Sequence, residues 1–157
     1  MDTMHIRSAI ASDAPGICRV HQRAVRLLCR AAYSPAQIEA WIGPRRAEDY
    51  IASMTNGERL WVAEISGTVV GFAGVQDDEI TAVYVDPEHT RHGFGQLLLQ
   101  AAEQSAQAHG VDCLFLEASL NAVAFYRHAG YGAEAPQTHR LRSGIAIPCV
   151  RMTKRLA

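Results

Sequence analysis

A short glycine-rich segment carries the residue types in this sequence that are most directly suited to chemistry. Gly93 and Gly95 flank Phe94, directly after Arg91 and His92, where a strand-like apolar run passes through a loop into a helix-like pattern. Glycines at a helix N-terminus leave backbone N–H groups unshielded, and these groups together with the helix dipole favour a pyrophosphate. Arg91 and His92 would add charge at its edge. The pattern therefore predicts a phosphate-binding loop.

Other interpretations of the same loop stay open at this point. An ordinary glycine turn before a helix would need no ligand. A dinucleotide-binding unit finds support in Glu117, which ends the next strand where a ribose-binding acid would lie. Against that unit, Leu98 replaces the third glycine, a long loop precedes the first glycine, and too little chain follows for a doubly wound sheet. The G-x-x-x-x-G-K-[ST] pattern of a P-loop does not occur.

Hydrophobic periodicity and turn residues predict the elements that position this loop. Strands are expected at residues 5–9, 60–65, 69–75, 79–85, 111–116, 131–135 and 145–152. Helices are expected from a cap at residues 12–13 to a break before residue 33, from residue 35 to a break at residues 43–44, at 47–54, at 93–109 and at 121–129. Strands that first follow one another and later alternate with helices predict an α+β fold, with a mixed sheet and helices on both faces.

The helix that opens at Gly93 is expected to be amphipathic. The predicted buried face consists of Phe94, Leu97, Leu98, Ala101 and Ser105. The predicted solvent face consists of Gln96, Gln100, Glu103, Gln104 and Gln107. Gly110 stands where a left-handed C-terminal cap belongs, so the helix should end there.

Composition narrows the class of protein. The chain has 157 residues, 48% hydrophobic and 20% charged, with a net charge of -1, which predicts one domain over residues 1–157 and excludes disordered and low-complexity classes. The longest nearly apolar run, residues 69–75, is far too short for a membrane helix, and residues 1–10 show no signal pattern. We therefore expect a cytoplasmic protein that contacts no membrane. The basic residues after Glu134 are too dispersed to predict nucleic-acid binding.

Cysteines and histidines show no metal-binding pattern. His89 and His92 are three residues apart on a loop without further ligands, an arrangement more typical of solvent-facing side chains. No metal site is predicted. The cysteines form no C-x-x-C pair, and we expect reduced, mostly buried thiols at Cys18, Cys29, Cys113 and Cys149.

Two segments together resemble the GNAT superfamily of N-acetyltransferases. In residues 83–95 (VYVDPEHTRHGFG), a strand ends in V-x-P and a loop closes on R-x-G-x-G, similar to the family's acetyl-CoA loop. In residues 118–131 (ASLNAVAFYRHAGY), a run of small residues leads to F-Y and then G-Y, similar to a later family segment. Many members carry Arg or Gln three residues before the first glycine, where this chain has Thr90. The resemblance covers nearly the whole chain.

The resemblance implies where acetyl-CoA would bind. It implies a mostly antiparallel sheet of about seven strands whose central pair, here residues 79–85 and 111–116, is parallel and splayed. The pantetheine amides would pair with the backbone from Val83 to Val85, as a peptide pairs with an open strand edge. The implied cofactor contacts are Val83, Tyr84, Val85, Arg91, His92, Gly93, Phe94, Gly95, Gln96, Asn121 and Tyr126.

The resemblance also implies that acetyl moves to an amine by direct attack. Tyr126 would protonate the departing thiolate, while a backbone N–H near Val83 would stabilise the carbonyl oxygen. Cys113 and Cys149 are expected in strands, where burial raises the pKa of a thiol and makes it a poor nucleophile. A route through an acyl-cysteine is therefore not expected.

An amine acceptor needs a base, because a lysine-type amine has a pKa of ~10.4. Glu79 is the first candidate, acting through water, since it begins the strand that leads to the thioester. Alternation along that strand would put Thr81 and Val83 on the face of Glu79. Glu117 is the second candidate, and His139 is the third.

Acceptor recognition is expected between the first two strands. Tyr33 and Trp41 are candidates for the walls of an amine pocket, with Glu117 beside them, although aromatic rings in a short helix also commonly pack onto a sheet. The expected acceptor is an amine-bearing small molecule or peptide, and the expected state is a monomer or homodimer. A different class stays open: a non-catalytic acetyl-CoA-binding sensor or interaction module.

Overall fold

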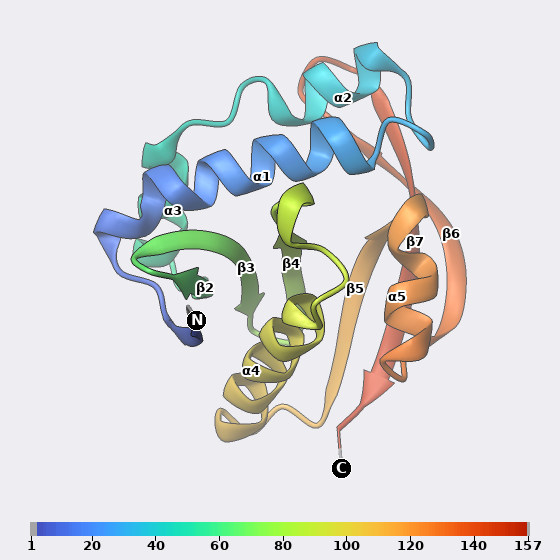
Figure 1. Cartoon of the computed structure of the whole chain (residues 1–157). Helices are drawn as coiled ribbons and strands as arrows, with labels where there is room; N and C mark the ends of the chain where they lie inside the picture. The colour runs from blue at the N-terminus through green and yellow to red at the C-terminus, as the bar shows by residue number, and fades with distance from the viewer. Residues whose placement is uncertain (1–2, 157) are drawn as a thin grey trace.

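The computed structural model describes residues 3–156, which form one seven-stranded sheet with helices on both faces (Figure 1). The sheet order is β1-β2-β3-β4-β5-β7-β6. The strands are β1 (Met4–Ser8), β2 (Arg59–Ile65), β3 (Thr68–Gln76), β4 (Glu79–Val85), β5 (Cys113–Ser119), β6 (Gly132–Arg140) and β7 (Ala146–Arg155). The α-helices are α1 (Ala14–Leu28), α2 (Pro35–Ile42), α3 (Ala47–Thr55), α4 (Phe94–Ala108) and α5 (Val123–His128).

Side chains pack against helices on both faces of the sheet, because successive side chains of each strand point to opposite faces. On β3, Phe72 packs with α1, whereas the next residue, Ala73, packs with α4. The helices α4 and α5 therefore cover one face, around Leu98 and Leu114, and α1 to α3 cover the other, around Ile17. Figure 1 shows α1 and α2 along the top of the view, with α4 and α5 below them.

The strands β4 and β5 are parallel and separate almost at once. Their only register pair among the described residues is Glu79 with Phe115, supported by a hydrogen bond from the N–H of Phe115 to the carbonyl of Asp78 at 3.0 Å. All other neighbouring strands are antiparallel. The predicted α+β fold with a central parallel, splayed pair is confirmed, and the gap that it opens is visible between β4 and β5 in Figure 1.

A β-bulge at Thr81 changes which side chains of β4 share a face. Ala82 pairs with Gly74 but Ile80 pairs with Val75, so Thr81 is the extra residue. As a result Ile80 and Val83 both pack on the α4 face. The expectation that Glu79 shares a face with Val83 is therefore wrong: Glu79 precedes Ile80 and lies on the α1 face of the sheet.

The buried face of α4 also differs from the expected one. Its buried residues are Leu98, Leu99, Ala102, Glu103 and Ala106, whereas Leu97 is 43% exposed. Glu103, expected in solvent, accepts hydrogen bonds from the Tyr131 hydroxyl at 2.7 Å and Lys154 Nζ at 3.1 Å. These partners compensate the burial of a carboxylate, and they lie in segments that the helical pattern alone does not locate.

Element boundaries shift most in the C-terminal half. β5 begins at Cys113 rather than residue 111, β6 continues to Arg140 rather than residue 135, and the helix expected at 121–129 is a 3-10 turn (Leu120–Ala122) followed by α5. Cys113 is exposed at the start of its strand, which corrects the expectation of a buried thiol there. The other three cysteines are buried, as predicted.

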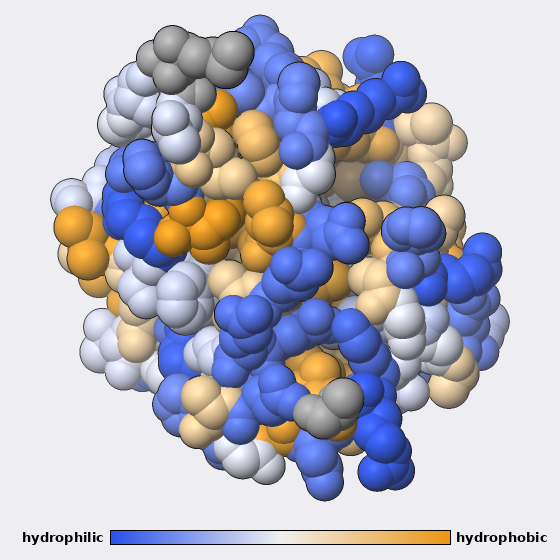
Figure 2. Space-filling model, turned by 60° about the horizontal axis from the view of Figure 1, so that its bottom comes forward, coloured by the Kyte–Doolittle hydropathy of each residue, from blue (hydrophilic) through white to orange (hydrophobic). Residues whose placement is uncertain are grey.

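Most of the surface in Figure 2 is hydrophilic, with hydrophobic side chains in a short band between polar ones. Within residues 3–156, no helix combines the length and apolar character that a membrane crossing requires.

Candidate active site

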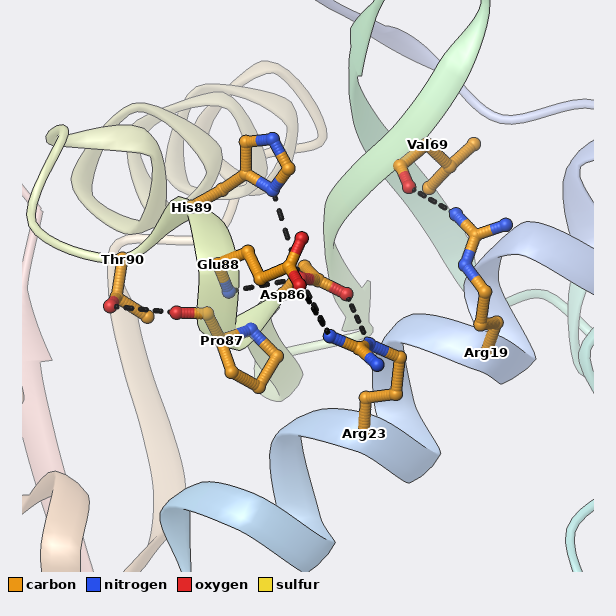
Figure 3. Close-up of polar contacts among 8 residues, drawn as sticks. All are labelled: Arg19, Arg23, Val69, Asp86, Pro87, Glu88, His89 and Thr90. Atoms are coloured by element: carbon orange, nitrogen blue, oxygen red, sulfur yellow. Dashed lines mark hydrogen bonds and ion pairs between the residues drawn. The ribbon is translucent and has the colours of Figure 1, made fainter.

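The loop after β4 is held in place by Asp86. Its backbone N–H donates to the carbonyl of Val70 at 2.8 Å, and its carboxylate accepts from the N–H of Glu88 at 3.0 Å and from Arg23 Nε at 2.8 Å. Arg23 reaches across from α1, as Figure 3 shows. Burial alone would raise the pKa of Asp86, but the hydrogen bonds from Arg23 and Glu88 outweigh it, so the pKa is lowered and the carboxylate stays charged.

The same loop ends in a backbone shape that presents N–H groups. Arg91 and Gly93 both have left-handed φ values, 69° and 79°, immediately before α4. No side chain caps α4, so the N–H groups of its first turn, at residues 94–96, have no acceptor within the helix. These N–H groups are therefore open to an acceptor from outside the helix, as the prediction of a phosphate-binding loop requires.

A cavity of about 320 Å³ lies against this helix end. Gly95 faces Phe125 of α5 so closely that a Cβ atom there would lie 3.4 Å from the ring. His92, a predicted cofactor contact, does not line the cavity, and its ring lies 5.6 Å from that of Phe94. The predicted cofactor residues that do line it are Val85, Arg91, Gly93, Phe94, Gly95 and Gln96.

A second cavity, of about 270 Å³, occupies the gap between β4 and β5. It shares Val85, Thr90, Gly95 and Phe125 with the first, so the two cavities adjoin near the C-terminal end of β4. The structure thus brings together residues predicted from separate parts of the chain: Val83, Tyr84, Val85, Glu117, Asn121 and Tyr126 all line this gap.

Tyr126 is buried in this gap, with 6% of its surface exposed. Its ring packs edge-on against Phe125 and Tyr131, but its hydroxyl has no hydrogen-bond partner among residues 3–156. Burial raises the pKa of Tyr126, so the phenol keeps its proton at neutral pH. Buried hydroxyls normally have a partner, and one aimed into a cavity is a donor available to a ligand.

Tyr84 faces the gap from β4. Its ring packs against those of His21, 4.4 Å away, and Phe72, 5.7 Å away, which fixes its orientation. His21 is buried and its pKa is lowered to about 3, chiefly by burial, so it is neutral. Asn121, at the far end of the gap, donates from Nδ2 to the carbonyl of Leu28 at 3.2 Å.

The three candidate bases converge although they are far apart in sequence. Burial, followed by the charge of Glu117, raises the pKa of Glu79. Glu117 lines the gap, and its Oε2 lies 3.9 Å from Nδ1 of His139. Glu79 itself does not line the cavity but lies at its closed end, beside Phe115. A carboxylate whose pKa is raised is better matched to accept a proton from an amine.

Tyr33 and Trp41 lie elsewhere than expected. Neither lines either of the two cavities described above. Tyr33 is buried, and its hydroxyl donates to the carbonyl of Pro148 at 2.6 Å and accepts from the N–H of Leu120 at 3.0 Å. Trp41 packs edge-on against it. The hydroxyl of Tyr33 therefore ties the start of the Leu120–Ala122 turn to β7, and its position in the structure is that of a packing residue.

Sequence reasoning missed Arg23 and Asp86, which hold the loop after β4, and Arg151, which is opposite Glu117 in the register of β5 and β7. The Asp-Pro pair that follows β4 is a signal for Asp86, because an Asp before Pro commonly caps a turn. Arg151 has no such local signal, and its position becomes visible only in the sheet. Among residues 3–156, no three His, Cys, Asp or Glu side chains come close enough to hold a metal ion.

Comparisons with known proteins agree with this geometry. The acetyltransferase (GNAT) domain model matches residues 29–156. The chain is 32% identical to the uncharacterized N-acetyltransferase YafP of Escherichia coli over 133 residues, 83% of each protein. The structure of a GCN5-related N-acetyltransferase from Rhodopseudomonas palustris matches with a TM-score of 0.90 and 30% identity over 99% of this chain and 98% of that one.

A further structure, yncA of Salmonella typhimurium with its cofactor acetyl-CoA, shares the fold with a TM-score of 0.73 and 24% identity, over 99% of this chain and 95% of that one. The predicted cofactor of this chain is therefore one that a structural relative binds. Together with the splayed strands and the helix end that follows them, these matches show that the chain belongs to the GNAT superfamily and is an acetyl-CoA-dependent N-acetyltransferase.

Proposed function

We propose that this N-acetyltransferase passes acetyl directly from acetyl-CoA to an amine, with Tyr126 as the proton donor and Glu79 as the base. The observation that carries the proposal is Tyr126, whose ring is buried and whose hydroxyl is protonated, without a partner among residues 3–156, and part of the lining of the gap between β4 and β5. A departing thiolate in this gap needs a proton, and Tyr126 is the buried donor that the gap provides.

The backbone supports the placement of acetyl-CoA. Val83 to Val85 pair with β3 on one edge of β4, but on the other edge, which borders the gap, they have no partner in β5. Pantetheine amides can therefore pair with the N–H and C=O groups on that edge. The pyrophosphate then lies on the first turn of α4, with Arg91 supplying charge. Asn121 and Phe94 border the two ends of this path.

The side chains supply the proton transfers. Glu79, whose pKa is raised by burial and by Glu117, takes a proton from the ammonium group through water, and Glu117 or His139 stands beside it. The amine nitrogen then forms a bond to the thioester carbonyl carbon. A backbone N–H near Val83 stabilises the oxyanion, and as the C–S bond breaks the sulfur takes the proton of Tyr126. The nitrogen loses its second proton as the amide forms, and this proton restores the Tyr126 phenol.

The cysteines favour direct attack over an acyl-enzyme. Cys29 borders the gap but is buried, and burial raises its pKa, so its thiol is protonated at neutral pH. Cys113 is exposed but does not line either cavity. The acceptor in this proposal is an amine-bearing small molecule or peptide, and the enzyme acts as a monomer or homodimer.

The test replaces Tyr126 with Phe, which keeps the ring and its packing. We expect kcat, measured as the release of free CoA thiol, to fall by about 100-fold or more, since general acid catalysis contributes about that much. Calorimetric titration should show acetyl-CoA binding within about twofold of the wild type, a change under about 0.4 kcal/mol. An unchanged kcat removes Tyr126 from its assigned role, and binding without acceptor-dependent thiol release would instead indicate a sensor.

A further inference from the structure

Three charged side chains share one face of the sheet beside the gap. Glu79 of β4 pairs with Phe115 of β5, and Glu117, two residues along β5, pairs with Arg151 of β7. Leu114 and Leu116 of β5 face α4, so Phe115 and Glu117, which alternate with them, face α1. Their register partners Glu79 and Arg151 lie on the same α1 face. The cavity in the gap extends to this face, because Leu28 and Cys29, at the end of α1, line it together with Glu117.

Arg151 is held in place but not neutralised. Its guanidinium carbon lies 4.0 Å from the centroid of the Phe115 ring, a cation–π contact that fixes the plane of the group. No hydrogen bond or ion pair joins Arg151 to any residue in 3–156, although Glu117 is directly opposite it in register. Its N–H groups are therefore available to an acceptor from outside the chain.

The carboxylates beside Arg151, those of Glu79 and Glu117, have few ionic or hydrogen-bonding partners among residues 3–156. Glu117 lines the gap and has only His139, at 3.9 Å, as an ionic partner. Glu79 has no hydrogen bond or ion pair within residues 3–156, and its partial burial raises its pKa. Two negative groups and one positive group thus stand side by side without pairing with each other, at the closed end of a cavity that contains the Tyr126 hydroxyl.

This unpaired arrangement matches a ligand that carries both charges. Resting on the proposed function, we propose that the acceptor is a free amino acid, whose ammonium group binds between Glu79 and Glu117 while its carboxylate binds the guanidinium of Arg151. Arginine suits a carboxylate because its N–H groups match the two oxygens. A polyamine would bring a cation to Arg151, and a peptide N-terminus or an internal lysine would bring no adjacent carboxylate.

The test is an acceptor panel with a matched chemical control. Each of the twenty common L-amino acids is assayed beside its own α-amide, with spermidine and cadaverine as amines without carboxylate, by the release of CoA thiol. For the best acceptor we expect kcat/KM to exceed that of its amide by about tenfold or more, since a site that pairs with a charged group rejects the analogue lacking it. In Arg151→Gln this preference should fall to about threefold or less.

Arg155→Gln is the control variant, because Arg155 lies on the same strand and face but pairs with Cys113, away from the gap. It should keep the wild-type preference, and both variants should bind acetyl-CoA like the wild type. Equal rates for acids and amides, equal losses in the two variants, or acetyl-CoA binding without acetylation of any amino acid each overturn the inference. A chain that acetylates only spermidine or cadaverine overturns it while leaving the proposed function intact, whereas absent acetyl-CoA binding overturns both.

Discussion

The two faces of β4 differ in whether backbone groups or side chains border the proposed binding sites. On the α4 side, the proposed cofactor path consists of backbone N–H groups, left-handed residues and glycines that follow one another between residues 83 and 96. On the α1 side, the proposed acceptor surface consists of Glu79, Glu117 and Arg151, three side chains from three strands. A surface of backbone binds a ligand common to a whole family, whereas a surface of side chains can change with single substitutions. The comparison predicts that changes on one side leave binding on the other unaffected.

The largest effect is expected from the acceptor side. In the double variant Glu79→Gln, Glu117→Gln, kcat/KM for the acceptor should fall by about 100-fold or more, because the base is lost. Since the pKa of Glu79 is raised, the wild-type rate should fall as the pH drops through that value and the carboxylate is protonated. The variant should lose this acidic limb. A double variant that instead weakens acetyl-CoA binding would break the separation of the two sides.

The next effect is expected from the cofactor side. Gly95→Val places methyl groups where a Cβ already lies 3.4 Å from Phe125, so they occupy the path between α4 and α5. We expect the Kd of acetyl-CoA, measured by calorimetry, to rise by about tenfold or more, as one or two kcal/mol of contacts are lost. Gly132→Val is the control, since a Cβ there meets nothing within 4 Å. Equal weakening in both variants would point to general destabilisation.

A smaller effect is expected at the tie between α1 and the loop. Arg23→Gln removes the ion pair with Asp86, and we expect acetyl-CoA to bind about threefold to tenfold more weakly with kcat changed by less than about twofold. The lowered pKa of Asp86 means that its contribution to folding is present above the pKa of the unfolded chain and lost as the pH falls through the folded value. The stability difference between variant and wild type should therefore be seen in urea at pH 7 and disappear at strongly acidic pH.

The smallest effect is a gain. Thr90 lines both cavities, and its hydroxyl donates to the carbonyl of Pro87 at 3.3 Å. Thr90→Arg adds a cation where many family members carry Arg or Gln, and we expect acetyl-CoA to bind about twofold to fivefold more tightly. The gain should shrink at 0.5 M salt, because an exposed ion pair is screened. If the gain in acetyl-CoA affinity is the same at low and high salt, packing of the Arg side chain and not its charge produces it.

The same difference between the two sides decides what the sequence could predict. The cofactor path follows from neighbours in the chain: Gly93 and Gly95 open a helix directly after an apolar strand, and the residue order alone shows it. The fold follows too, because turns and periodicity mark each strand. Only the ends of elements shift, as at Cys113, because the last residues of a strand depend on what packs against them.

The acceptor side could not be predicted in this way. Arg151 faces Glu117 only because β7 lies between β5 and β6, and no local pattern gives that order. The bulge at Thr81 exchanges the faces to which the side chains of β4 before and after it point. The one residue in the sequence that relates to it is Gly74, which leaves space for the Thr81 side chain. Glu103 is buried for a similar reason, since its partners Tyr131 and Lys154 come from distant segments.

The single register pair between β4 and β5 has a consequence for motion. Side chains around Leu98 and Leu114 join the two halves of the sheet, but among residues 3–156 the strand backbones pair only where Asp78 and Glu79 meet Phe115. We expect the amides that border the gap to exchange their hydrogens with solvent faster than those between β3 and β4. A pantetheine chain bound as proposed would close this seam as an additional strand would, so slowed exchange from Val83 to Val85 would report how much of the enzyme is occupied.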